Sequence, residues 1–269
     1  MNNSIYSRER AFTLIEISIV LVIIGFIVGG IFLGQTLIRQ FRINGVMMDE
    51  QKYVQATLQF QQKYNALPGD FANATAYWGA MDSCPPTPGA ASSGGTLTCN
   101  GNGNGQVENG SEDILFWQHL ANAQLIEGQY TGISPYAGAP FSNVAGVNVP
   151  AGRLPGSAFG VAYLGQNFIC NGGLTPCVFP SSYGHALFFG GAAPKNDTVP
   201  AFPILTTAEA LALDSKYDDG LPGTGRIVTW LPSYFNLVPN CATTSVASTA
   251  IYNTSSTGQQ CSFIFITGF

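Results

Sequence analysis

Charge is the scarcest property of this chain. Of its 269 residues only 9% are charged, whereas an average soluble domain has about 25%. Ten lysines and arginines stand against 15 aspartates and glutamates, which gives a net charge of -5. Because a nucleic-acid-binding surface needs clustered basic residues, we expect no nucleic-acid partner.

Histidine is almost absent. His119 and His185 are the only two, and neither lies beside a recognisable nucleophile motif. A Ser-His-Asp triad is defined by geometry and not by order in the sequence. A catalytic role for either histidine is therefore an open alternative to a structural role. The glycines around Gly101 follow no predicted strand and lack the lysine of a phosphate-binding loop. The sequence therefore favours a protein that is not an enzyme.

One long apolar run lies near the N-terminus. From Ile17 to Leu33 it has no charge and no proline, and with its flanks it reaches the roughly 20 residues that a membrane-spanning helix needs. A cleaved secretory signal has a shorter apolar region, followed by a small-residue cleavage site. Here the small residue, Ala11, precedes the run. Two arginines before it favour a cytoplasmic N-terminus, although two more follow it.

Glu16 brings a carboxylate into the start of this apolar segment. On an insertion scale a charge at the bilayer centre costs about 2.5 to 3.5 kcal/mol. A buried charge is tolerable when it is paired and costly when it is alone, so Glu16 needs a partner. The alternative is an uncleaved signal anchor that happens to contain Glu16.

The segment Ala11-Phe12-Thr13-Leu14-Ile15-Glu16, with its basic leader and apolar helix, resembles the class III signal of the type IV pilin and type II secretion pseudopilin family. One departure is Ala11, where the family normally has glycine. The resemblance implies that a prepilin peptidase cuts between Ala11 and Phe12 on the cytoplasmic side and methylates the new amino group of Phe12. It also implies that Glu16 neutralises the amino terminus of a neighbouring subunit as helices stack in a filament.

The pattern behind this segment predicts one long helix. Between Thr36 and Ala66 there is no proline and apolar residues recur at helical spacing, and Pro68 ends the helix. Four glycines within the apolar half could serve close packing or local melting. The predicted parts are a leader peptide at 1–11, a transmembrane and assembly helix at 12–35, the periplasmic half of that helix at 36–67 and a globular periplasmic domain at 68–269.

The globular part is expected to combine short helices with a small sheet. A helix is predicted from Ser111 to Glu127, and another from Thr207 to Lys216, where Thr206 and Glu209 have capping-box spacing. Strands are predicted at 158–164, 186–189, 226–231 and 263–267. The predicted fold class is α+β and pilin-like: a long N-terminal helix packed on a small antiparallel sheet with long, disulfide-stapled loops.

All six cysteines follow the apolar helix, and none forms a Cys-x-x-Cys pair that would favour zinc. In an oxidising periplasm disulfides are the default. Six cysteines permit 15 connectivities; we predict pairing of sequence neighbours because each pair brackets a loop-like stretch. The pairs are Cys84 with Cys99, Cys170 with Cys177, and Cys241 with Cys261.

Two stretches carry oxygen ligands that could bind a metal ion. A structural calcium is the one cofactor that the sequence suggests. Residues 100–108 have EF-hand-like order with asparagine in place of aspartate; a glycine-rich turn is the favoured interpretation. Asp214, Asp218 and Asp219 precede a Gly-Leu-Pro-Gly turn. Major pseudopilins carry an acidic calcium-binding loop near this part of the fold, to which this stretch is similar in character but not in motif. A capped helix end with solvated acids is the alternative.

These features predict a filament subunit in the inner membrane of a bacterium, single-pass, with its C-terminal domain in the periplasm. Its expected partners are other pilin or pseudopilin subunits, prepilin peptidase and an inner-membrane assembly platform. A membrane-anchored periplasmic binding or adhesion module that never polymerises is the alternative. The sequence does not distinguish a secretion pseudopilus from a retractile pilus or a DNA-uptake fibre.

Overall fold

The computed structural model describes residues 12–84, 95–137, 139, 142–165, 169–170, 175–176, 179, 181, 183–192, 199–230 and 241–269. Ala11 and Cys177 lie outside these residues, and nothing is described of the Cys170 side chain. The chain divides into two compact units, residues 1–42 and residues 43–269.

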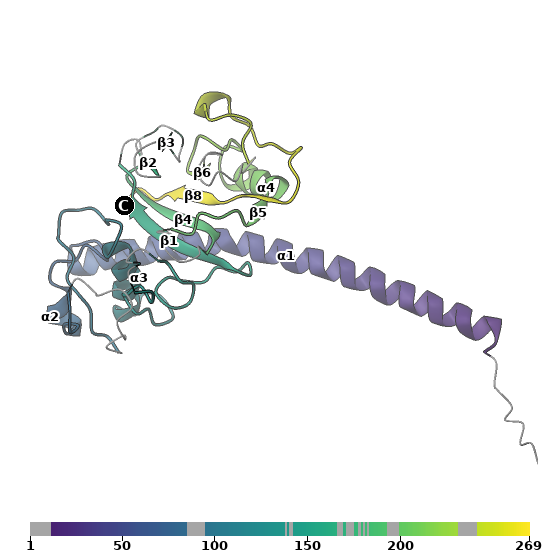
Figure 1. Ribbon diagram of the computed structural model, residues 1–269, viewed down its shortest axis with the longest axis horizontal. Helices are drawn as coiled ribbons and strands as arrows, with labels where there is room; N and C mark the ends of the chain where they lie inside the picture. The colour runs from purple at the N-terminus through teal and green to yellow at the C-terminus, as the bar shows by residue number, and fades with distance from the viewer. Residues whose placement is uncertain are drawn as a thin grey trace, which may run out of the picture. The chain divides into compact units, whose positions relative to one another are not determined.

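The first helix, α1, runs from Leu14 to Tyr64 without interruption (Figure 1). Its 51 residues correspond to about 77 Å at 1.5 Å per residue. The sequence predicted a helix from residue 12 to residue 66, two residues longer at each end. The helix stops because Asn65 adopts a left-handed φ of 52° while its N–H still donates to Gln61 O at 2.8 Å, a helix end that asparagine tolerates.

From residue 43 onward α1 buries one face. The buried positions recur every three or four residues, as expected for an amphipathic helix on a core. They are Ile43, Gly45, Val46, Met47, Glu50, Tyr53, Ala56, Thr57 and Phe60.

A four-stranded antiparallel sheet forms the centre of the second unit, in the order β1-β4-β8-β6. Its strands are β1 (Ser157–Tyr163), β4 (His185–Gly191), β8 (Phe263–Ile266) and β6 (Ile227–Thr229). All four correspond to predicted strands. Two further strand pairs are short: β2 (Ile169–Cys170) with β3 (Thr175–Pro176), and β5 (Leu205–Thr206) with β7 (Gln259–Cys261). These four strands were not predicted, because two or three residues show little alternation. β6 is equally short, but it lies within the longer stretch at 226–231 from which it was predicted.

Within the described residues this unit also contains three short α-helices, α2 (Ala74–Trp78), α3 (Glu112–Asn122) and α4 (Thr207–Tyr217), and a 3-10 turn, η2 (Ala247–Thr249). The predicted capping box of α4 is confirmed, since Thr206 N donates to Glu209 Oε2 at 2.8 Å and Glu209 N to Thr206 Oγ1 at 3.2 Å. The end predicted for α3, Glu127, is wrong. Gln124 takes a φ of 60°, and Leu125 N bonds back to Leu120 O, which closes the helix early in a Schellman motif without glycine.

Both faces of the sheet are buried: consecutive residues of β1 and β4 are buried, and successive side chains of a strand point to opposite faces. Phe159 and Phe189 face a cluster that includes α1, where Tyr53 packs edge-on against Phe159 at 5.1 Å and against Trp117 of α3 at 5.0 Å. Phe188 lies in a second cluster on the other face. One long helix and a small antiparallel sheet, with two disulfides, fit the α+β pilin-like fold that the sequence predicted.

Candidate functional site

Glu16 caps the start of α1. Thr13 N donates to Glu16 Oε2 at 2.8 Å, the Thr13 hydroxyl donates to the same oxygen at 2.8 Å, and Glu16 N donates back to Thr13 Oγ1 at 3.3 Å. This is a capping box, which satisfies amide groups that a helix N-terminus otherwise leaves unpaired. The sequence analysis missed it, although Thr-x-x-Glu spacing is the signal for it. Within a single chain Glu16 therefore already has a structural role.

The apolar half of α1 is exposed from its first turn. Phe12 is 79% exposed and Phe41 is 77% exposed, so the exposed apolar surface runs along the helix between them. Soluble monomers rarely expose apolar patches larger than a few hundred Å². The helix contains one stretch that is long and apolar enough to cross a membrane. This surface needs lipid or another chain to cover it.

The four glycines of this half have open surroundings. A Cβ placed on Gly25, Gly29, Gly30 or Gly34 would meet no atom within 4 Å. The helix is continuous through all four. Close packing against these glycines would therefore require a second chain. Helix packing and local melting of the helix at these positions both stay predictions.

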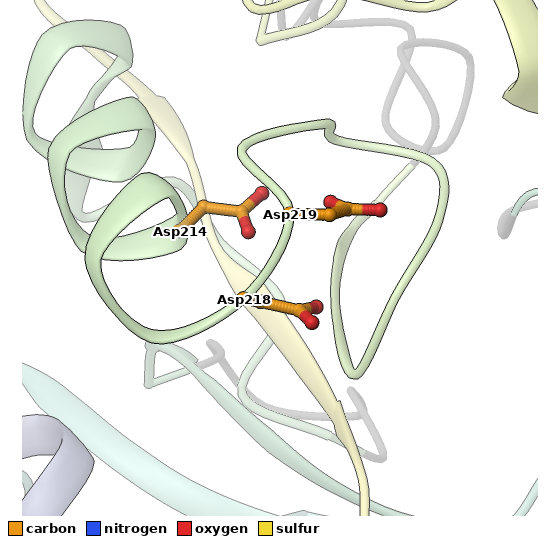
Figure 2. A group of neighbouring side chains, drawn as sticks. All are labelled: Asp214, Asp218 and Asp219. Atoms are coloured by element: carbon orange, nitrogen blue, oxygen red, sulfur yellow. The ribbon is translucent and has the colours of Figure 1, made fainter.

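The three predicted calcium ligands do come together (Figure 2). Asp214 lies in the last turn of α4, Asp218 caps the end of that helix, and Asp219 follows. One oxygen from each lies within 4.8 Å of the others. Oxygen-rich clusters of this kind are what Ca²⁺ prefers.

Each of these carboxylates also has a hydrogen-bond donor from the protein. Asp214 Oδ2 accepts from the Tyr252 hydroxyl at 2.6 Å, Asp219 Oδ2 from the Thr224 hydroxyl at 2.5 Å, and Asp218 Oδ2 from Ile227 N at 2.8 Å. Burial raises the pKa of Asp214 to about 7, although the Tyr252 hydrogen bond opposes this. The donors stabilise the turn after α4 with or without a cation, so a capped helix end and a calcium site are both compatible with this geometry.

The EF-hand-like stretch at 100–108 is wrapped around a carboxylate from elsewhere in the chain. Asp70 accepts backbone N–H groups from Gly103, Asn104 and Gly105 at 2.6, 3.0 and 2.8 Å. A Cβ on Gly101 would lie 2.3 Å from a backbone oxygen, so this position admits glycine alone. The favoured interpretation, a glycine-rich turn, agrees with this geometry. Sequence reasoning missed Asp70, whose signal was the Leu-Pro-Gly-Asp turn.

The two histidines bind backbone groups. His119 is fully buried; its Nδ1 accepts from Gly69 N at 2.9 Å and its Nε2 lies 3.2 Å from Cys99 O. Burial lowers the pKa of His119 to about 4, so the ring is neutral. His185 Nε2 accepts from Val107 N at 3.1 Å and its Nδ1 lies 2.9 Å from Phe269 O. Both rings act as structural cross-links.

Two of the three predicted disulfides are present. Cys84 is bonded to Cys99 and Cys241 to Cys261. The third pair, Cys170 with Cys177, lies outside the side chains that the structure describes. Cys99 of the first bridge packs in a cluster with Leu115 of α3, and the second bridge ties β7 to the segment that precedes η2.

The comparisons with known proteins concern the N-terminus. Residues 6–32 match the family described as the Prokaryotic N-terminal methylation motif. The N-terminus fits a class III prepilin signal. The matched segment ends inside α1 and includes none of the sheet. No curated protein and no solved structure matches the chain.

The class III signal has two implications. It supports a precursor of pilin or pseudopilin type that prepilin peptidase processes, and it points to a structural subunit instead of an enzyme. Together with the long apolar helix behind it, it indicates a membrane-anchored protein.

Proposed function

We propose that this chain is a structural subunit, a pilin or pseudopilin, of a type IV pilus-like or type II secretion filament. Prepilin peptidase would cut between Ala11 and Phe12 and methylate the Phe12 amino group. The globular part would lie in the periplasm until an inner-membrane assembly platform adds the subunit to the filament. Other copies of this chain, or related subunits, would then be its neighbours.

One observation carries this proposal: a methylation motif at residues 6–32 includes the start of a helix whose apolar half is exposed on all sides. A bilayer covers such a surface in the unassembled subunit, and a bundle of identical helices covers it in a filament. In either environment the backbone N–H and C=O groups of the helix keep their hydrogen bonds, because those bonds are formed within the helix itself.

Glu16 supplies the selectivity for assembly in this proposal. In lipid the carboxylate is costly, and the capping box with Thr13 reduces that cost by satisfying one oxygen. A methylated Phe12 ammonium from a neighbouring subunit would supply the missing positive charge at the other oxygen. A correctly placed subunit would thus be stabilised relative to a lone one.

The proposal is tested on sheared fibres from cells that express the full chain. Immunogold labelling against the globular domain should decorate fibres, and the intact mass of fibre protein should show loss of residues 1–11 and gain of one methyl group. A strain without prepilin peptidase is the control and should yield unlabelled fibre fractions. A processed protein that stays in the membrane would favour the anchored binding or adhesion module, and a chain that retains Met1 would overturn the processing itself.

A structural calcium at Asp214, Asp218 and Asp219 is a separate proposal. It is supported by the convergence of three carboxylates at the end of α4. An ion there would fix the turn between α4 and β6, because the same turn supplies Asp218 and the hydrogen bond to Ile227 N.

A further inference from the structure

Four Asn-Gly dipeptides follow one another in the loop that surrounds Asp70. They are at 100–101, 102–103, 104–105 and 109–110. Asparagine is a thermolabile residue. It is most exposed to attack before glycine, because a following residue without a Cβ leaves the backbone nitrogen free to approach the asparagine side chain.

The chemistry of that attack is deamidation. The glycine nitrogen forms a bond to asparagine Cγ, the Cγ–Nδ2 bond breaks, and ammonia leaves with the proton of the attacking nitrogen. Water then opens the five-membered imide at either carbonyl and yields aspartate or isoaspartate. The reaction therefore requires the glycine N–H to give up its proton and the asparagine amide to leave.

In this fold the attacking nitrogens are held by Asp70. Gly103 N donates to Asp70 Oδ1 at 2.6 Å, and Gly105 N donates to Asp70 Oδ2 at 2.8 Å. Asp70 itself is 3% exposed. A nearby negative charge disfavours formation of a second one, so a nitrogen that donates to a carboxylate resists deprotonation as well as movement.

The leaving groups are held by a second carboxylate. Asn102 Nδ2 donates to Glu108 Oε2 at 3.2 Å, and Asn104 Nδ2 donates to Glu108 Oε1 at 3.1 Å. The asparagine oxygens are used too: Asn102 Oδ1 accepts from Asn104 N at 2.9 Å and Asn104 Oδ1 from Gln106 N at 2.8 Å. Every polar atom of both side chains is thus engaged.

We propose that Asn102 and Asn104 are latent deamidation sites. Asp70 binds the attacking glycine nitrogens and Glu108 binds the leaving side-chain amides, and both sets of hydrogen bonds slow the reaction. Once either asparagine reacts, Glu108 loses a donor and gains a negative neighbour. The loop cannot close again in the same way, because the new carboxylate offers no N–H group. Deamidation is irreversible, so the modified residue shows that the loop opened at some earlier time.

The test uses the full chain in detergent, aged at mildly alkaline pH and analysed by peptide mapping that separates isoaspartate. Asp70→Asn should speed deamidation at Asn102 and Asn104 by about tenfold or more, the factor that one hydrogen bond to a charged group represents. The rate at Asn109 is the internal control, because Gly110 N donates to Asp113 Oδ1 at 3.0 Å and not to Asp70. Glu108→Gln, which keeps the side-chain length but accepts through one oxygen, should produce a smaller rise at the same two sites.

Unchanged rates in Asp70→Asn would overturn the proposal, and slower rates would show that Asp70 acts as a base and promotes the reaction. An equal rise at Asn109 would report general unfolding of that variant. In that case Glu108→Gln decides: a rise confined to Asn102 and Asn104 supports the proposal, and wild-type rates at both overturn it.

Discussion

Arg226 Nη2 lies 2.8 Å from Glu50 Oε1, and this ion pair joins the residue before β6 to the buried face of α1. The Glu50 side chain is 1% exposed and the Arg226 side chain 52%. The other Glu50 oxygen, Oε2, has no hydrogen-bond partner within the described part of the chain. Burial raises the pKa of Glu50, and the neighbouring Arg226 opposes that rise. A carboxylate in this position depends on its single charged neighbour.

Arg226→Ala should therefore destabilise the protein through Glu50. Loss of one partner of a buried pair costs about 3 to 5 kcal/mol, and because Arg226 is half exposed we expect about 1 to 3 kcal/mol. The Arg153→Ala variant is the matched control: Arg153 forms two hydrogen bonds of 2.8 Å with Asp49. The two arginines are about equally exposed, but the Asp49 side chain is 15% exposed where that of Glu50 is 1%, so water can solvate Asp49 and the loss should cost under about 1 kcal/mol. Denaturant unfolding of both variants checks this, and equal losses would contradict it.

The second prediction separates the charge of Glu16 from its capping role. Glu16→Gln keeps an oxygen for the Thr13 amide but removes the charge, whereas Thr13→Ala removes the reciprocal hydroxyl contact and keeps the charge. If Glu16 pairs with a neighbouring Phe12 amino group, Glu16→Gln should be inserted and cleaved but poorly incorporated into fibres, since an unpaired buried cation costs about 3 to 5 kcal/mol. Thr13→Ala should incorporate nearly normally, because loss of a helix cap costs about 1 kcal/mol. Quantitative immunoblots of sheared fibres measure both, and the reverse ranking would assign Glu16 to capping alone.

His119 should make stability depend on pH. Its pKa is lowered by burial from 6.5 to about 4, so between these values the unfolded chain binds a proton that the native protein does not. Stability should fall as the pH drops from 6.5 to 4, by at most about 3 kcal/mol. Asp113 and Asp214, whose pKa values burial raises to about 7, act in the opposite sense.

The contribution of His119 is isolated by comparing melting temperatures of the wild type and His119→Gln across this range. The gap between the two should narrow as the pH falls towards 4. A gap that does not change with pH would show that the pKa of His119 is the same in the folded and unfolded chains, and would contradict the prediction.

Calcium provides the fourth prediction. An ion bound only to the folded state stabilises by about 2.7 kcal/mol at a hundredfold excess over its dissociation constant. Calcium should raise the melting temperature of the full chain, and magnesium, which demands tighter octahedral geometry, should raise it less. Asp219→Asn should reduce the calcium effect and is the gentlest variant, because Asp219 is the exposed member of the group. An unchanged melting temperature at millimolar calcium would leave the three aspartates as a helix end.

The fifth prediction concerns the cysteines. Non-reducing peptide maps should show Cys84 with Cys99, Cys241 with Cys261 and Cys170 with Cys177, and no free thiol. Removal of the Cys84–Cys99 bridge, whose cysteines are 15 residues apart, should cost about 3 kcal/mol in the loop-entropy account. A link between Cys170 and any cysteine other than Cys177 would disprove the third pair and leave the other two intact.

The long elements of this fold were predictable because their signals are local. The apolar run, the absence of proline before Pro68 and the Thr206–Glu209 spacing each lie within a few turns of helix. The prediction that α3 ends at Glu127 failed because Gln124 takes a conformation usually reserved for glycine. The next residue, Leu125, packs against the core, a tertiary contact that the local sequence does not show.

The candidate sites also divide into residues within local sequence patterns and residues that act on distant parts of the chain. Phe12, Glu16 and the aspartates at the end of α4 lie in short local segments, so sequence reasoning could propose roles for them. Asp70 holds residues more than 30 positions away, and Arg226 pairs with a carboxylate 176 positions away. The Leu-Pro-Gly-Asp turn marks Asp70 as a turn residue, but the partners of Asp70 and of Arg226 are set only when the chain folds.

The connectivity of the two described bridges has a consequence for biogenesis. Cys84 and Cys99 are the first two cysteines of the chain, and Cys241 and Cys261 are the last two. In a chain that crosses a membrane from its anchored N-terminus onward, an oxidase can join Cys84 to Cys99 before any competing thiol has emerged. If the globular part is translocated in this order, the order alone would produce the first pairing, and that bridge would form without an isomerase.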